Sequence, residues 1–138
     1  MQWIPPRVFL ACGDGTYGKR LRDSLEIRLG FDVCSDGQDQ VNVIRKATAF
    51  RPDLVILEME LVSRNAFGVV ESIKSVLPKV PLFLVIECPS MRSEREALTR
   101  GVDAVFAKEK EEDYASLLRN ARAAVNPNCL SRSPEAEN

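Results

Sequence analysis

Two patterns of apolar residues alternate along the chain. Short runs of apolar residues, typical of strands covered on both faces, occupy positions 8–12, 54–57 and 81–86, and two further runs at 31–34 and 102–106 are each interrupted by one aspartate. After each run, apolar residues recur every three or four positions, as on one buried face of a helix. Five strands that strictly alternate with five helices predict an α/β fold, a doubly wound parallel sheet with helices on both faces.

Helix ends and helix faces follow from the same pattern. Gly30 and Gly101 each come directly after a helical segment, where a residue that tolerates the left-handed conformation is favoured. Pro52 stops the second helix and favours an extended conformation at Arg51. The residues expected to be buried on the helices are Tyr17, Leu21, Leu25, Leu29, Val41, Ile44, Ala47, Val69, Val70, Ile73, Val76, Leu77, Ala97, Leu98, Tyr114, Leu117, Leu118, Ala121 and Val125.

The chain of 138 residues has the length of one domain. We assign residues 7–125 to that domain and residues 1–6 to an N-terminal extension. Residues 126–138 are polar, contain two prolines and lack periodicity, so they are predicted to form a disordered tail. No internal repeat or second domain is evident.

Composition excludes several classes of function. The net charge of −1 provides no field that would attract nucleic acid or an anionic membrane. No apolar run approaches the length of a membrane span, and the first residues do not resemble a signal peptide. Histidine is absent, which removes the commonest general base and metal ligand. The four scattered cysteines form no C-x-x-C pair and are expected to be buried filler in a reducing cytoplasm.

Charged residues follow several of the predicted strands. Asp14 follows the first, Glu58 ends the third, Ile86 and Glu87 end the fourth, and Lys108 follows the fifth. Because the carboxyl ends of parallel strands share one edge, these residues should converge there. Two carboxylates and an ammonium at one edge would suit an ion pair, a metal site or a phosphoryl-transfer pocket.

The spacing of these residues resembles the receiver domain of bacterial two-component response regulators over roughly residues 7–125. The matching features are Pro52-Asp53-Leu54-Val55-Ile56-Leu57 before the acidic strand end, Gly68, Pro81, Gly101 and Lys108. The resemblance implies the flavodoxin-like strand order 2-1-3-4-5 and a signalling role, without enzymatic activity. It also implies a histidine kinase or a downstream signalling protein as partner, and it allows a homodimer.

Three positions depart from the pattern of the receiver family. The acidic pair that holds a divalent cation in the family is Gly13-Asp14 here, the phosphoacceptor position is Glu58, and the Ser/Thr position is Ile86. Asp14 and Lys108 match the family. With only Asp14 and Glu58 as candidate ligands, Mg²⁺ should bind weakly, and no other cofactor is expected.

Glu58 carries one more methylene than aspartate, which moves its carboxylate by about 1.5 Å. A misplacement of about 1 Å can slow in-line phosphoryl transfer roughly a hundredfold. We therefore expect Glu58 to pair with Lys108 and to hold one signalling state without phosphorylation, in a degenerate, pseudo-receiver site. The alternative is a tolerated ion pair with no role in signalling, because a partly buried pair is weak evidence of function by itself.

A second function remains open at the first turn. Gly13, Gly15 and Gly18 form a G-x-G-x-x-G motif between a strand and a helix, and Asp36 lies where a ribose-binding acid would be expected. This motif is typical of nucleotide- or dinucleotide-binding regulatory domains. Against it, Asp14 lies within the loop that must approach a pyrophosphate, and the segment from Pro52 to Lys108 has no part in such a site.

Overall fold

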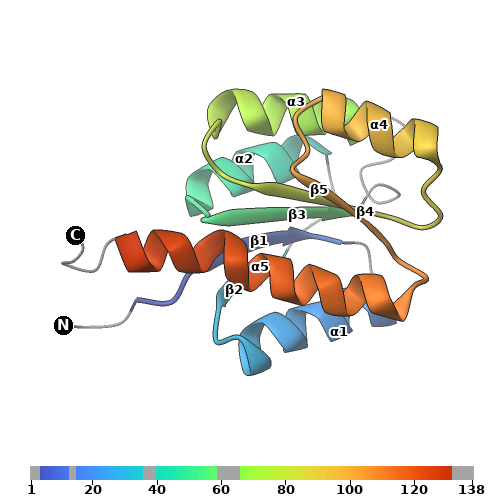
Figure 1. Cartoon of the computed structure of the whole chain (residues 1–138). Helices are drawn as coiled ribbons and strands as arrows, with labels where there is room; N and C mark the ends of the chain where they lie inside the picture. Colours follow the sequence, from blue (N-terminus) through green and yellow to red (C-terminus); the bar gives the residue numbers. More distant parts are fainter. Residues whose placement is uncertain (1–3, 13–14, 36–39, 59–65, 132–138) are drawn as a thin grey trace.

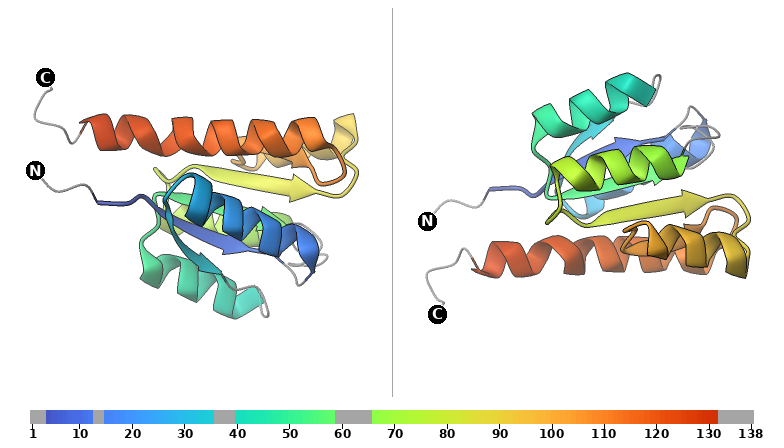
Figure 2. Two further views of the ribbon diagram at one scale, coloured as in Figure 1. Left: turned by 90° about the horizontal axis from the view of Figure 1, so that it is seen from below. Right: turned by 90° about the horizontal axis from the view of Figure 1, so that it is seen from above.

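A computed structural model describes residues 4–12, 15–35, 40–58 and 66–131 of the chain. A central sheet lies between two layers of helices (Figures 1 and 2). The strands are β1 (Arg7–Ala11), β2 (Asp32–Ser35), β3 (Leu54–Glu58), β4 (Leu82–Ile86) and β5 (Ala104–Ala107). The helices are α1 (Thr16–Asp23), η1 (Ser24–Arg28), α2 (Gln40–Phe50), α3 (Ala66–Val76), α4 (Met91–Thr99) and α5 (Glu111–Ser131).

All the strand pairings are parallel, and the strands lie in the order β2-β1-β3-β4-β5. The predicted α/β class and the order 2-1-3-4-5 are therefore confirmed. Every residue of β3 and of β4 is buried. Side chains alternate between the two faces of a strand, so this pattern requires helices on both sides and explains the absence of polar alternation.

Two apolar clusters fill the space on the two faces of the sheet. One cluster joins Leu54 and Ile56 of β3 to α1, η1 and α5, and the other joins Val55 and Leu57 to α2, α3 and α4. On α5, all five residues expected to face the core are buried. The sheet is thus held by α5 with α1 on one face and by three helices on the other.

Two expected core positions are wrong. Val76 and Leu98 are each about half exposed, at 48% and 49%. On α4 the buried residue is Ala97, and one residue turns a helix by about 100°, so Leu98 points away from the sheet. Helical spacing alone did not show how little of α4 contacts the sheet.

Three backbone details also differ from the prediction. The expected helix at 16–29 is an α-helix followed by a π-helical turn, η1, before Gly30 at φ 72° ends it. Arg51 adopts the left-handed conformation at φ 55° rather than an extended one, because it ends α2 and its N–H donates to the Thr48 carbonyl. Residues 126–131 belong to α5, so the helix passes the predicted start of the tail. The assignment of residues 7–125 as the domain stays a prediction.

None of the described helices combines the length and the apolar character needed to cross a bilayer.

Candidate functional site

The carboxyl edge of the sheet brings Glu58 and Lys108 together. Glu58 is the last residue of β3, and Lys108 follows β5, which lies across β4 from β3. The Lys108 Nζ donates a hydrogen bond to Glu58 Oε2 and forms an ion pair with it. The Glu58 side chain is 6% exposed and that of Lys108 is 25% exposed. The pair therefore connects two non-adjacent strands at the predicted edge.

The turn after β5 positions Lys108. Its N–H donates to the carbonyl of Ile86 at 2.8 Å, and the N–H of Ala107 donates to Asp113 Oδ2 at 2.7 Å. Asp113 belongs to the first turn of α5, so the turn is anchored both to β4 and to the last helix. These contacts limit the positions that the lysine side chain can adopt.

Tyr17 and Cys12 also lie beside the pair. The Tyr17 ring centroid is 5.6 Å from Lys108 Nζ, within the range of a cation–π contact. The Tyr17 hydroxyl is buried and has no hydrogen-bond partner among the described residues, and burial raises the pKa of this phenol. The pKa of the Cys12 thiol is raised to about 12, mainly by burial and also by the nearby charge of Glu58, against an opposing effect of Lys108.

The apolar pattern of the sequence predicts only a core position for Tyr17 and for Cys12. Their places in the sequence indicate a location at the carboxyl edge of the sheet, because Cys12 directly follows β1 and Tyr17 lies in the first turn of α1. Both therefore belong to the edge where Glu58 lies. Among the described residues, a phenol ring and a thiol thus lie close to the two charges.

The remaining predicted site residues are placed differently. Ile86 ends β4 and is buried in the cluster that faces α2, α3 and α4, so an apolar side chain occupies the Ser/Thr position of the family. Glu87 lies next to it in sequence but is exposed. Gly13, Asp14 and Asp36 lie outside the described residues, so the structure does not test the acidic pair or the complete glycine motif.

Among the described ranges, no group of three His, Cys, Asp or Glu side chains could hold a metal ion. Asp14, one of the two weak Mg²⁺ candidates, is not among those residues. Expected weak Mg²⁺ binding by Asp14 and Glu58 therefore stays a prediction.

Comparison with solved structures identifies the fold. The chain is similar to a LuxR-family two-component response regulator from Aurantimonas sp. SI85-9A1, with a TM-score of 0.78 and 16% identity over 90% of this chain and 87% of that one. It is similar to a response regulator from Clostridium difficile, with a TM-score of 0.76 and 20% identity over 88% and 96% of the two chains.

An orphan response regulator of H. pylori has a TM-score of 0.74 and 21% identity over 87% of this chain and 96% of that one. No family profile and no curated protein matches the chain. At these identities the comparisons establish the fold of a response-regulator receiver domain. They give no support to the nucleotide-binding alternative, and the observed strand order also differs from the 3-2-1-4-5-6 order of dinucleotide-binding domains.

Proposed function

We propose that this receiver-fold chain is a two-component-type signalling module whose state does not depend on phosphorylation. The observation that carries the proposal is the Glu58–Lys108 pair at the end of β3. In the receiver family, a lysine at this place pairs with the phosphate on an aspartate. Here a carboxylate on a longer side chain already contacts the lysine, so the contact forms without a modification.

The surroundings of the pair favour a permanent contact. The carboxylate is buried, and separating it from Lys108 would leave a charge with poor access to water. A phosphoryl group would add a second negative charge and three oxygens to a carboxylate that is already buried against Lys108. Ile86, in addition, has no hydroxyl to donate to such a group. The module would therefore act by protein–protein interaction rather than as an enzyme.

The first experiment tests independence from phosphorylation. The chain incubated with acetyl phosphate and Mg²⁺ should keep its intact mass. The triple variant Gly13→Asp, Glu58→Asp, Ile86→Thr serves as the positive control, because it restores the three departures, and it should gain a phosphoryl group. A phosphoryl adduct on Glu58 or Asp14 of the unmodified sequence would contradict the proposal.

A second experiment separates a functional pair from a tolerated one. A histidine kinase or a downstream signalling protein, captured from the source cell, is the expected partner. Partner affinity should change in Glu58→Ala and in Lys108→Ala if the pair sets the signalling state. Unchanged affinity in both variants, with folding verified by circular dichroism, would favour an ion pair without a signalling role.

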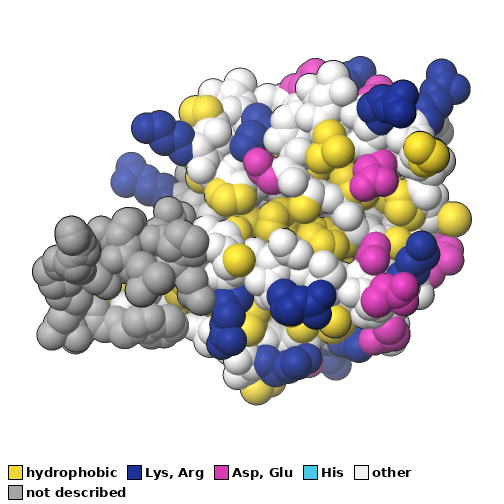
Figure 3. All heavy atoms as spheres, in the orientation of Figure 1, with side chains coloured by type: hydrophobic (Ala, Val, Ile, Leu, Met, Phe, Trp, Pro, Cys, Tyr) yellow, Lys and Arg dark blue, Asp and Glu magenta, His cyan; other side chains and the backbone are white. Residues whose placement is uncertain are grey.

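Two surfaces are available for such a partner. Met91 and Leu98 expose apolar side chains on α4, which packs against β5, and a band of hydrophobic atoms crosses the middle of the molecule in Figure 3. The second surface lies between α1 and α5, where Lys and Arg side chains gather in the lower half of the same view.

A further inference from the structure

A groove of about 340 Å³ lies between the first helical segment and α5. Its walls carry Arg28 at the end of η1 and Arg119 and Arg122 on α5, and Leu29 and Leu118 contribute apolar surface between them. All three arginines are exposed. The groove therefore combines a basic rim with an apolar floor.

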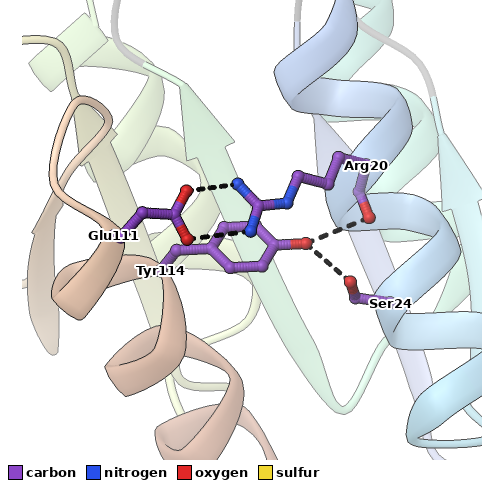
Figure 4. A network of polar contacts seen from close by, with 4 residues as sticks. All are labelled: Arg20, Ser24, Glu111 and Tyr114. Carbon is purple, nitrogen blue, oxygen red and sulfur yellow. Dashed lines mark hydrogen bonds and ion pairs between the residues drawn. The ribbon is translucent and has the colours of Figure 1, made fainter.

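One end of the groove is held rigidly by the contacts drawn in Figure 4. Two nitrogens of the Arg20 guanidinium donate to the two carboxylate oxygens of Glu111 at 2.6 and 2.9 Å. The same guanidinium stacks over the Tyr114 ring at 3.8 Å. The Tyr114 hydroxyl donates to the Arg20 carbonyl at 3.1 Å, so Ser24 Oγ, 2.6 Å away, donates to that hydroxyl. These contacts fix the spacing between α1 and α5.

The positive charges along the rest of the groove are not neutralised by acidic side chains of the described residues. Arg20 is neutralised by Glu111, whereas Arg28, Arg119 and Arg122 have no acidic partner within the described part of the chain. Three guanidinium groups around one groove repel each other and attract an anion. Guanidinium groups also bind carboxylates in a planar, bidentate manner, as Arg20 does here.

The shape and the surrounding charges select the occupant. A symmetric pairing with a second copy about a two-fold axis at the centre of the groove would place these arginines against each other. A long polyanion or an anionic bilayer would extend beyond the groove and approach Glu111, Glu112 and Asp113 at the start of α5. A short acidic segment fits between these acids and the end of η1, and an apolar side chain on it could pack on the floor.

We propose that the groove between α1 and α5 binds a short acidic segment of a partner protein. Its carboxylates pair with Arg28, Arg119 and Arg122, and one of its apolar side chains packs on Leu29 and Leu118. This inference rests on the proposed role in protein binding and specifies the surface and the chemistry of the partner. It does not require that Glu58 and Lys108 set the signalling state.

The test uses a fluorescent synthetic peptide of alternating Glu and Leu residues and the full chain. The double variant Arg119→Glu, Arg122→Glu should weaken binding about tenfold or more, because it reverses two contacts. Arg92→Glu, Arg95→Glu on α4 is the matched control, with the same charge change, the same spacing and equally exposed side chains. The control should stay within about twofold, since surface charges far from a contact contribute little.

Two further peptides test the two parts of the groove. Replacing Leu by Ser should weaken binding if the apolar floor takes part, and replacing Glu by Lys should abolish it. In NMR spectra, the changes in backbone amide chemical shift on adding the Glu-Leu peptide should be largest in η1 and α5. Equal weakening in both double variants, or shifts centred on α4, would overturn the proposal.

Competing occupants give distinct results. The chain could bind phosphatidylglycerol vesicles or a single-stranded oligonucleotide more tightly than the peptide and lose this binding in Arg119→Glu, Arg122→Glu. That result would assign the surface to those anions instead. Peptide binding that appears only after removal of residues 132–138 would assign the groove to the chain's own acidic end. Glu58→Ala separates the two proposals: if it alters partner binding but not peptide binding, the groove acts independently of the pair.

Discussion

At the scale of single residues, the environment of Glu58 matters more than its charge. The side chain is 6% exposed, and the ammonium of Lys108 compensates a carboxylate that has little access to water. Removing one partner of a buried pair lowers the free energy of unfolding more than removing both, because a single removal leaves the other charge buried without its counter-charge. The pair can thus be essential to stability even if its net contribution is small.

Lys108→Met should therefore lower the free energy of unfolding by about 3 kcal/mol, as measured by urea denaturation. The double variant Glu58→Leu, Lys108→Met should recover much of this loss, since it removes both charges. Arg92→Met, at an exposed position on α4, is the control and should change little. Additive losses in the double variant would show that the two charges are not coupled.

Cys12 provides a second prediction at this scale. Because burial raises the pKa of its thiol to about 12, the reactive thiolate is almost absent at neutral pH. Cys88 is exposed, so the expectation that the cysteines are buried is wrong for this residue. Cys88 should react with iodoacetamide before Cys12 in the native chain, with the labelled sites located by peptide mass spectrometry. Labelling of Cys12 should require denaturant. Rapid labelling of Cys12 in the folded chain would contradict the burial found here.

At the scale of elements, the packing of α5 against α1 depends on polar contacts as well as on the apolar cluster. The Arg20 side chain is half exposed, so its ion pair with Glu111 contributes modestly by itself. It acts together with the Tyr114 hydroxyl, which joins the Arg20 carbonyl and Ser24. The π-helical turn begins at Ser24, so this contact connects α5 to the segment where the helical geometry changes.

The hydrogen bonds from Arg20 hold the pKa of Glu111 below its usual value of 4.5. A lowered pKa in the folded state means that the stabilisation is complete above the unfolded value and is lost as pH falls toward the folded value. Glu111→Gln should therefore lose stability at neutral pH relative to the parent chain, and the difference should shrink below pH 4.5. Thermal melts of both chains across this range provide the measurement. A difference that grows on acidification would contradict the assignment.

At the scale of the whole molecule, the sheet is most protected at its centre. β3 lies between β1 and β4, and all its residues are buried under helices on both faces. β2 and β5 each have a strand on one side only. Amides at the centre of such a sheet exchange only through the largest unfolding events.

Hydrogen exchange should accordingly be slowest for amides in β3 and β4, and faster in β2 and in α4, which buries only Ala97. Leu84→Ala should accelerate exchange throughout β3 and β4, because it opens a cavity between the sheet and its helices. Leu98→Ala is the matched control on the exposed side of α4. Exchange in β3 as fast as in β2 would contradict this order of protection within the sheet.

The fold class was accessible from the residues because unbroken apolar runs and helical spacing each reflect a local requirement for burial. The same reasoning placed Glu58 and Lys108 at one edge, since parallel strands end together. The resemblance to receivers added the order of the strands. Leu98 and Val76 were misjudged because the apolar pattern marks the side of a helix that can be buried, and the extent of burial depends on what packs there.

Sequence alone thus determined the alternation of elements, the absence of a hydroxyl at position 86 and the extra methylene at position 58. Only the tertiary structure decided that Tyr17 and Cys12 flank the ion pair, and that Arg28, Arg119 and Arg122 share a groove with an apolar floor. The reason is physical: local patterns specify which backbone conformation buries apolar surface. The distance between groups far apart in the chain depends on how α1, α5 and the strands pack together.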